Sequence, residues 1–243
     1  NDGSADNTLN ILRGYEANES RIRVINLPHS GFTKAVTQAV RHCNPQSKYL
    51  MNHDSDDISL PDKLRQLVEY LEIHPQTAIV GCFAEYFDDG GNNRGHPKIE
   101  WQPERISQTF SEVNSMIHSA SLIRRLVFEK IGSYREEFSM VEDYDFWARA
   151  LMAGFEMANI PQVLHRIRLH PDSICSRNKQ QQRVMADRVR QYYREYLEKR
   201  TAGNAHPVGT AGSRTKKSLN ILHTVELYHP HIGGSEELIK QVS

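Results

Sequence analysis

The sequence predicts an α/β protein with a mostly parallel sheet flanked by helices, and three observations support this fold class. Short β-rich runs alternate with segments whose apolar residues recur at helical spacing through the first half of the chain. Acidic residues follow one of these runs directly, at the kind of strand end where such sheets bind ligands. Hydrophobic residues make up 38% of the 243 residues, which is enough for a packed core.

The predicted elements follow one another from residue 21. Strands are expected at 21–27, 48–54, 77–87 and 115–125, and one or two more at 155–170. Helices are expected at 31–43, from Ser59 to Pro75, at 126–131, 141–155 and 178–200. Each helix has a stripe of apolar side chains, and Pro75 and Gly132 are typical of helix ends. A polar, glycine-rich loop is expected at 88–95.

Charge and cysteine content exclude several classes of protein. The 30 basic and 30 acidic side chains give no net charge, which argues against a nucleic-acid binder. Cys43, Cys82 and Cys175 are far apart and form no CxxC pair, so a cytoplasmic, reducing environment is expected. No apolar stretch approaches the ~20 residues that span a bilayer. Peripheral contact with the inner face of a membrane stays open.

Three aspartates stand within four positions, at Asp54, Asp56 and Asp57, directly after a predicted strand. Acidic residues are common in turns and at helix starts, which is one explanation. The other is a site for Mg²⁺ or Mn²⁺, because hard cations prefer oxygen ligands and offset the repulsion between carboxylates. An EF-hand is excluded, since the loop lacks the glycine and glutamate at the required positions.

A second acidic group and two histidines are further candidates. Glu142, Asp143 and Asp145 begin a predicted helix, where they either favour the helix dipole or supply a general base. His165 and His170 flank a basic tripeptide after the last predicted strand. Such histidines are either structural hydrogen-bonding groups or, for His170, a metal ligand on a loop.

Five segments in order resemble glycosyltransferase family 2, which has the GT-A fold. "NDGSADNT" resembles the family's (D/N)DGSxDxT loop, "GFTKAVTQAV" its Gly-x-x-x-Ala helix opening, and "YLMNHDSDDISLPDKL" its Asp-Ser-Asp-Asp segment. "HSASLIRRLVFEKIGSYREEFSMVEDYDFWARA" resembles the acceptor-side stretch that ends in Glu-Asp, and "VLHRIRLHPDSICS" the closing segment. The resemblance covers residues 1–177.

The resemblance implies a role for five residues. Asp2 would contact the nucleotide base, and Asp54 the ribose and diphosphate side of the donor. Asp56 would hold Mg²⁺ or Mn²⁺, with His170 as a further metal or diphosphate contact, and Asp143 would be the catalytic base. The implied reaction is inverting transfer from a nucleotide-diphosphate sugar, expected to be a UDP-sugar, to a glycan or lipid-linked acceptor. Synthesis of a surface polysaccharide would be the process.

The domain organisation is expected to have three parts. Residues 1–200 would form the family 2-like domain, which begins at Asn1 without the family's first strands, so a fragment of a longer chain is expected. The family's Asn is replaced by His29 and Thr37. The polar stretch 201–217 reads as a linker. Residues 218–243 resemble the start of a GT-B transferase domain with Gly233 and Gly234 in its turn; an ordinary strand–helix turn is the alternative.

Two other functions stay open from the sequence. A non-catalytic module that binds a sugar nucleotide or glycan within a larger transferase would need no base, and the absence of the first strands favours it. A nucleotidyltransferase would also use paired acids and a metal, but it does not account for the Glu-Asp segment. The aspartates at 54, 56 and 143 favour the transferase.

Overall fold

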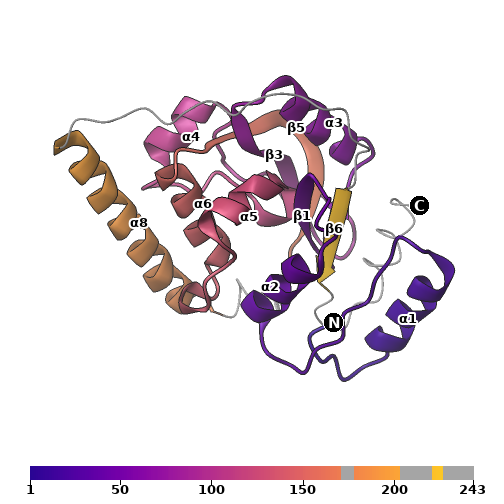
Figure 1. The fold of residues 1–243 in the computed structure, drawn as a ribbon. Coiled ribbons are helices and arrows are strands. Elements are labelled where there is room, and N and C mark those ends of the chain that lie inside the picture. Colours follow the sequence, from indigo (N-terminus) through magenta and orange to yellow (C-terminus); the bar gives the residue numbers. More distant parts are fainter. Residues whose placement is uncertain (171–177, 203–220, 227–243) are drawn as a thin grey trace.

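The computed structural model describes residues 1–170, 178–202 and 221–226 (Figure 1). Most of the predicted linker at 201–217 and of the predicted second-domain segment at 218–243 lies outside the described residues, as do Cys175, Gly233 and Gly234. None of the helices described is both long and apolar enough to cross a membrane.

Helices and strands are interspersed along the chain. The helices are α1 (Thr8–Asn18), α2 (Phe32–His42), α3 (Lys63–Ile73), α4 (Pro103–Thr109), α5 (Arg125–Ile131), α6 (Glu142–Met152) and α8 (Lys179–Ala202), with short 3-10 helices η1 (His118–Ala120) and η2 (Glu136–Phe138). The strands are β1 (Tyr49–Asp54), β2 (Ile58–Ser59), β3 (Thr77–Phe87), β4 (Leu122–Arg124), β5 (Glu156–Arg168) and β6 (Ile221–Glu226).

The strands form one sheet in the order β2-β5-β3-β4-β1-β6. β3 runs parallel to β5, and β1 runs parallel to β6 at the edge. The short β4 lies between β1 and β3 and runs antiparallel to both, while β2 is antiparallel to β5. The α/β class is as predicted, but the sheet is mixed, because β4 enters it in the opposite direction.

Helices cover both faces of the sheet (Figure 1). On one face α3 packs Leu67 and Leu71 against Tyr49 and Met51 of β1. On the other face α2, α5, α6 and α8 share a larger core around Trp147. Neighbouring residues of β3 serve different cores: Ile79 belongs to the larger one and Val80 to the smaller one. The alternation of side chains along a strand explains this division.

Most of the strongly periodic segments form the predicted element. The helices expected at 31–43, 126–131, 141–155 and 178–200 correspond to α2, α5, α6 and α8, and the strands expected at 48–54, 77–87 and 155–170 to β1, β3 and β5. Gly132 follows α5 with a φ of 77°, a backbone angle that glycine adopts more readily than other residues. The apolar stripe of α6 buries Phe146, Trp147 and Ala150, as expected.

Three predictions are corrected by the structure. Residues 21–27 form no strand, because only Leu27 pairs, in an isolated bridge to Asp2. The helix expected from Ser59 begins at Lys63, because Ser59 lies in β2 and Asp62, with a φ of 67°, precedes the helix. The segment expected as a strand at 115–125 contains η1 and only the short β4. The sequence analysis also missed α1, which buries none of its residues.

Gly81 is a position in β3 where no side chain fits. A Cβ at residue 81 would lie 2.1 Å from Asn159 Oδ1, whose amide nitrogen donates to the carbonyl oxygens of Glu100 at 2.7 Å and Ser115 at 2.8 Å. We expect Gly81→Ala to lower the free energy of unfolding by about 1–3 kcal/mol in urea denaturation, because overpacking displaces Asn159.

Gly14 provides the matched control for this substitution. It lies within α1, and a Cβ there would meet no atom within 4 Å. Gly14→Ala should leave the free energy of unfolding unchanged or raise it by up to about 1 kcal/mol, since alanine is the better helix former. Equal effects of the two substitutions would contradict the packing described around Gly81.

Candidate active site

β1 delivers the aspartates to the carboxyl end of the sheet. It is buried until its last residue, after which the chain turns, and the Asp57 amide donates to the Asp54 carbonyl oxygen at 3.2 Å. β2 follows at once and pairs with the second half of β5. Residues 54–57, which we call the acid loop, are therefore held between β1 and the end of β5.

Asp54 is the last residue of β1 and is half-buried. Asn52 Nδ2 donates a hydrogen bond to Asp54 Oδ1 at 2.9 Å. Burial raises the pKa of Asp54 well above its ordinary value, and the negative charges of Asp57, Asp56 and Asp143 raise it further. These four carboxylates share one electrostatic environment, so a cation among them would favour their ionised forms.

Asp56 lies against His170, which is 114 residues further along the chain. Asp56 Oδ2 and His170 Nε2 are 3.0 Å apart, and their side chains are 33% and 18% exposed. Arg168 Nε donates to the Asp56 carbonyl oxygen at 3.1 Å and binds the end of β5 to the acid loop. The structure thus brings together the two residues that the sequence analysis expected to hold a metal.

Asp57 faces inward and anchors the acid loop. Ser119 Oγ and His165 Nε2 donate to Asp57 Oδ2 at 2.7 Å and 2.9 Å. The backbone amide of Arg168 donates to Asp57 Oδ1 at 3.1 Å. Both carboxylate oxygens therefore have partners within the protein, and the third aspartate of the motif is a structural one.

Lys63 is buried beneath this network, with 1% of its surface exposed. Its Nζ lies 2.7 Å from the Ser119 carbonyl oxygen, 3.0 Å from His165 Nδ1 and 3.3 Å from Ser59 Oγ, so each ammonium hydrogen has an acceptor. Burial lowers the pKa of Lys63 to about 8 and holds the pKa of His165 well below its ordinary value. Because Nδ1 of the neutral His165 accepts from Lys63, Nε2 carries the hydrogen donated to Asp57.

Asp143 lies in the first turn of α6, beside the buried Glu142. Glu142 Oε2 accepts hydrogen bonds from Thr33 Oγ1 at 3.1 Å and from the Met140 amide at 2.7 Å, and so ties the start of α6 to α2. The Tyr144 amide donates to Asp143 Oδ1 at 2.7 Å. Burial raises the pKa of Asp143 to about 6, so the carboxylate is mostly ionised at pH 7, as a general base must be.

A second buried chain of polar groups connects Asp54 with the region of Asp143. Asn52 Nδ2 faces His118 Nδ1 at 3.5 Å, and His118 Nε2 lies 2.7 Å from the Tyr134 hydroxyl. Burial lowers the pKa of His118 to about 3, which keeps the ring neutral. Burial and the charge of Asp143 raise the pKa of Tyr134, so its hydroxyl stays protonated beside the acids.

Asp2 holds the loop that leads into α2. Its Oδ1 accepts from the amide and hydroxyl of Ser30 at 2.8 Å and 2.9 Å, and its Oδ2 accepts from the Gly31 amide at 2.8 Å. Gly3 approaches this loop closely, because a Cβ there would lie 2.6 Å from the His29 nitrogen. The contact of Asp2 with a nucleotide base stays a prediction.

The sequence indicated His165 as a structural hydrogen-bonding group, but Lys63 and Ser119 were missed, and Asp57 was not separated from its neighbours. One signal was present. Lys63 stands four residues before Leu67 on the apolar stripe of α3, where a solvated lysine is not expected. A basic residue at that position indicates a buried partner.

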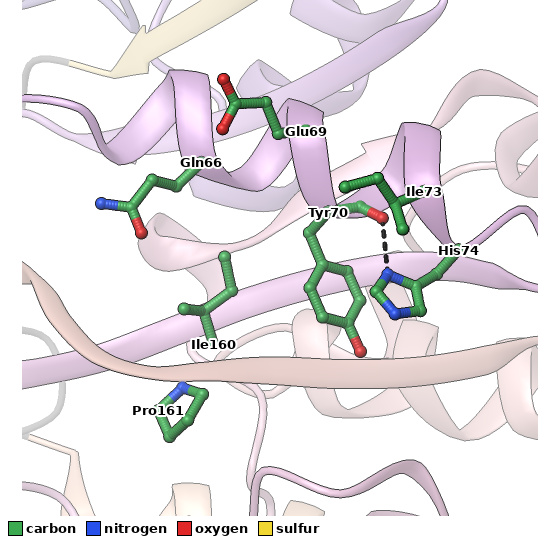
Figure 2. Close-up of a pocket in the computed structure, with 7 residues that line it drawn as sticks. All are labelled: Gln66, Glu69, Tyr70, Ile73, His74, Ile160 and Pro161. Atoms are coloured by element: carbon green, nitrogen blue, oxygen red, sulfur yellow. Dashed lines mark hydrogen bonds between the residues drawn. The ribbon is translucent and has the colours of Figure 1, made fainter.

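Figure 2 shows a shallow cavity of about 270 Å³ that is separate from these residues. It lies between α3 and β5, and its lining consists of Gln66, Glu69, Tyr70, Ile73, His74, Ile160 and Pro161. His74 Nδ1 donates to the Tyr70 carbonyl oxygen at 2.9 Å, and the two rings stack with centroids 4.1 Å apart. None of the acids at the strand ends lines this cavity, so it is not the candidate active site.

Curated proteins similar to this chain are named as glycosyltransferases. It is 28% identical over 234 residues to the bifunctional glycosyltransferase pgtA of Dictyostelium discoideum, covering 82% of this chain and 30% of that protein. It is 27% identical over 177 residues to the amylovoran biosynthesis glycosyltransferase AmsE of Erwinia amylovora, covering 72% and 65%. The chain therefore spans less than two thirds of the length of these relatives.

A solved structure supports the predicted GT-A fold. The mannosyltransferase PcManGT from Pyrobaculum calidifontis, in complex with GDP-Man and Mn²⁺, matches with a TM-score of 0.52 at 15% sequence identity. The match covers 85% of this chain and 55% of that one. In addition, residues 1–132 match the family model described as Glycosyl transferase family 2, which is more than half of the sequence. The chain therefore belongs to glycosyl transferase family 2.

Proposed function

We propose that this chain transfers a sugar from a nucleotide-diphosphate sugar to a hydroxyl group of an acceptor. The contact between Asp56 and His170 beside Asp54 carries the proposal. Asp143, on a different element, is close enough to raise the pKa of Asp54. A group of ligands for a cation and diphosphate, with a separate carboxylate nearby, is the arrangement that displacement of a diphosphate requires. Membership of glycosyl transferase family 2 supports the same reaction.

Mg²⁺ or Mn²⁺ is the cation that suits these residues. The 3.0 Å between Asp56 Oδ2 and His170 Nε2 fits two neighbouring ligands of one octahedral ion with bonds of about 2.1 Å. Among the residues described, no three His, Cys, Asp or Glu side chains form a metal site, so the diphosphate and water would complete the coordination. When bound, such a cation neutralises charge on the departing diphosphate. The Mn²⁺ in the PcManGT complex supports this assignment.

Asp143 would act as the base in a single displacement. Its carboxylate takes the proton of the acceptor hydroxyl while that oxygen bonds to the anomeric carbon. The bond from the anomeric carbon to the diphosphate oxygen breaks at the same time, and the nucleoside diphosphate leaves with the electron pair. Attack opposite to the leaving group inverts the anomeric configuration. The protonated Asp143 then returns its proton to water.

The donor and the biological process are the finer parts of the proposal. A UDP-sugar is the donor that the family resemblance favours, and the GDP-Man bound to PcManGT supports a nucleotide-diphosphate sugar in general. The name of AmsE, an amylovoran biosynthesis glycosyltransferase, supports polysaccharide synthesis as the process. A location at the cytoplasmic face of a membrane is a further part of the proposal. A second transferase domain from residue 218, after a linker at 201–217, belongs to the same proposal. β6 lies within that second segment but pairs with β1. A domain boundary at residue 218 must therefore allow this strand to join the sheet of the first domain.

The donor is tested by incubating the full chain with UDP- and GDP-sugars and Mn²⁺ and measuring released nucleoside diphosphate by chromatography. We expect release from a UDP-sugar, loss of release with EDTA, and recovery with added Mn²⁺. Tight binding of a sugar nucleotide without release, with or without glycan acceptors, would instead favour the non-catalytic binding module. No binding of any sugar nucleotide would contradict both functions.

Asp143→Asn should lower the transfer rate by about 10²–10⁴-fold and leave donor binding nearly unchanged, because the amide cannot take a proton. The raised pKa of Asp143, about 6, also predicts the pH dependence. The ionised base is present above this pKa, so the wild-type rate should be highest above pH 6 and fall as pH drops through about 6.

Glu142→Gln is the matched control, since burial and the charge of Asp143 raise the pKa of Glu142 to about 7. The amide oxygen can still accept from Thr33 and Met140, so this variant should keep the fall in rate near pH 6. If Glu142→Gln loses the acid limb and Asp143→Asn keeps it, Glu142 and not Asp143 is the base.

Asp56→Ala should weaken Mn²⁺-dependent binding of UDP by about 10-fold or more in calorimetric titration, because one of two protein ligands is lost. Asp187→Ala is the control, since Asp187 is an exposed acid on α8 that forms a local ion pair with Arg190. Unchanged affinity in Asp56→Ala would reject the metal role of this residue.

A further inference from the structure

Asp57, His165 and Lys63 are buried, and the proposed reaction leaves them unused. They nevertheless connect the acid loop, the start of α3, η1 and β5. We infer that these three are positioning residues that set the contact between Asp56 and His170. This inference rests on the proposed function, in which Asp56 and His170 bind the cation.

The connections of Asp57 lead to both members of that contact. Asp57 follows Asp56 directly in the chain, so its carboxylate fixes the backbone that carries the first ligand. Its Oδ1 accepts from the amide of Arg168, two residues before the second ligand, His170. One buried carboxylate therefore holds the backbone on both sides of the contact, although the two sides are more than 100 residues apart in sequence.

His165 and Lys63 hold Asp57 in this orientation. His165 lies on β5, accepts from Lys63 at one ring nitrogen and donates to Asp57 at the other, at 3.0 Å and 2.9 Å. Lys63 reaches the network from the first turn of α3 and also donates to the Ser119 carbonyl oxygen. The neutral imidazole of His165 therefore bridges the buried ammonium of Lys63 and the buried carboxylate of Asp57. It supplies a hydrogen-bond acceptor to the first and a donor to the second.

The same network reaches the backbone of Asp54. His53 Nδ1 donates to the Asp54 carbonyl oxygen at 2.8 Å, and His53 Nε2 accepts from Ser59 Oγ at 2.8 Å. Ser59 Oγ in turn accepts from Lys63 at 3.3 Å. The acid loop is thus fixed at its first and last residues, which leaves the Asp56 side chain directed at His170.

A purely stabilising role explains this arrangement poorly. Well-packed apolar side chains usually stabilise a core as much as a buried ionic network does. The network lies directly under the two candidate ligands, and outer groups that orient metal ligands typically change metal affinity 10–100-fold when they are altered. Positioning of the ligands accounts for both the location of the network and its polar character.

The test compares full-length wild-type protein with Asp57→Asn and Ser119→Ala. Asp57→Asn replaces one acceptor oxygen by a donor and so loses a hydrogen bond to Arg168 or to Ser119 and His165. Ser119→Ala removes one bond to Asp57 and is the milder change. Asp62→Asn is the matched control, because Asp62 is exposed and its carboxylate forms an ion pair with Arg65 on the surface of α3. Circular dichroism at low temperature selects the conditions under which each variant is folded.

Two readouts are recorded on the folded proteins. Mn²⁺ affinity in the presence of UDP is measured from the electron paramagnetic resonance signal of free Mn²⁺. The side-chain nitrogen signals of His170 and His165 are measured by NMR on ¹⁵N-histidine protein without metal. We expect Mn²⁺ to bind about 10-fold more weakly to Asp57→Asn and about threefold more weakly to Ser119→Ala. We expect the His170 signals to shift in Asp57→Asn and in Asp56→Ala, and Asp62→Asn should match wild type.

The two readouts separate this inference from the proposed function. Wild-type Mn²⁺ affinity and unshifted His170 signals in folded Asp57→Asn or Ser119→Ala would overturn the positioning role. Shifted His170 signals together with no Mn²⁺ binding by the wild type would instead support the positioning and refute the proposed function. A lower melting temperature without a change in Mn²⁺ affinity or in the His170 signals would show that the network only stabilises the fold, and would also overturn the positioning role.

Discussion

The hydrogen bonds of Asp57 determine where the acid loop lies in this molecule. Without them, a turn that carries three carboxylates would be driven apart by like charge and drawn toward water. Bonds from Ser119, His165 and the Arg168 amide hold one of the three carboxylates in the interior. The other two, Asp54 and Asp56, are left at the end of β1. The three neighbouring aspartates thus have different roles: Asp57 anchors the loop, and Asp54 and Asp56 are the candidate ligands.

The remaining parts of the site are attached to the same frame by further buried polar contacts. Glu142 ties the start of α6, and with it Asp143, to Thr33 of α2. Asp2 in turn holds the backbone at Gly31, where α2 begins. The candidate base therefore has a support on α2, in addition to the buried polar chain through His118 that connects its region with Asp54. The two groups interact through charge, since Asp143 raises the pKa of Asp54.

The raised pKa values of these acids have a common cause and a functional consequence. Burial is the largest contribution for Asp54, Asp56 and Asp143. For Asp54 and Asp56 the neighbouring carboxylates add to it, so a cation and its diphosphate would relieve an unfavourable concentration of negative charge. Asp143 keeps a pKa near 6, low enough for ionisation at neutral pH and high enough to accept a proton readily.

The elements that the sequence predicted correctly are those whose apolar pattern lies within the element itself. The stripe on α6 and the apolar run of β3 are local patterns, and both elements formed as expected. A strand also needs a neighbouring strand. Residues 21–27 have the composition of a strand, but only Leu27 pairs, in an isolated bridge to Asp2. The direction of β4 and the pairing of β6 depend on contacts distant in sequence. The residue pattern indicated Asp54, Asp56, Asp143 and His170 as candidates, and the family resemblance added Asp2. The specific roles came from the resemblance, because no spacing rule connects Asp56 with His170.

Lys63 and His165 show most clearly what local patterns leave out. Lys63 stands on the apolar stripe of α3 and His165 is fully buried on β5, and the hydrogen bond between them gives each side chain a buried partner. Such a pair becomes recognisable once α3 and β5 are known to be neighbours. α3 starts at Lys63, four residues later than expected, because Ser59 belongs to β2 and pairs there with His165 of β5.

The central claim is that the acid loop and His170 form one site for a cation and the diphosphate of a donor. Crystals of the full chain grown with Mn²⁺ and UDP, measured at the manganese absorption edge, test it most directly. The account predicts one anomalous peak that contacts Asp56, His170 and the diphosphate oxygens. A peak bound elsewhere, or UDP bound away from Asp54 with no manganese at the acid loop, would contradict it.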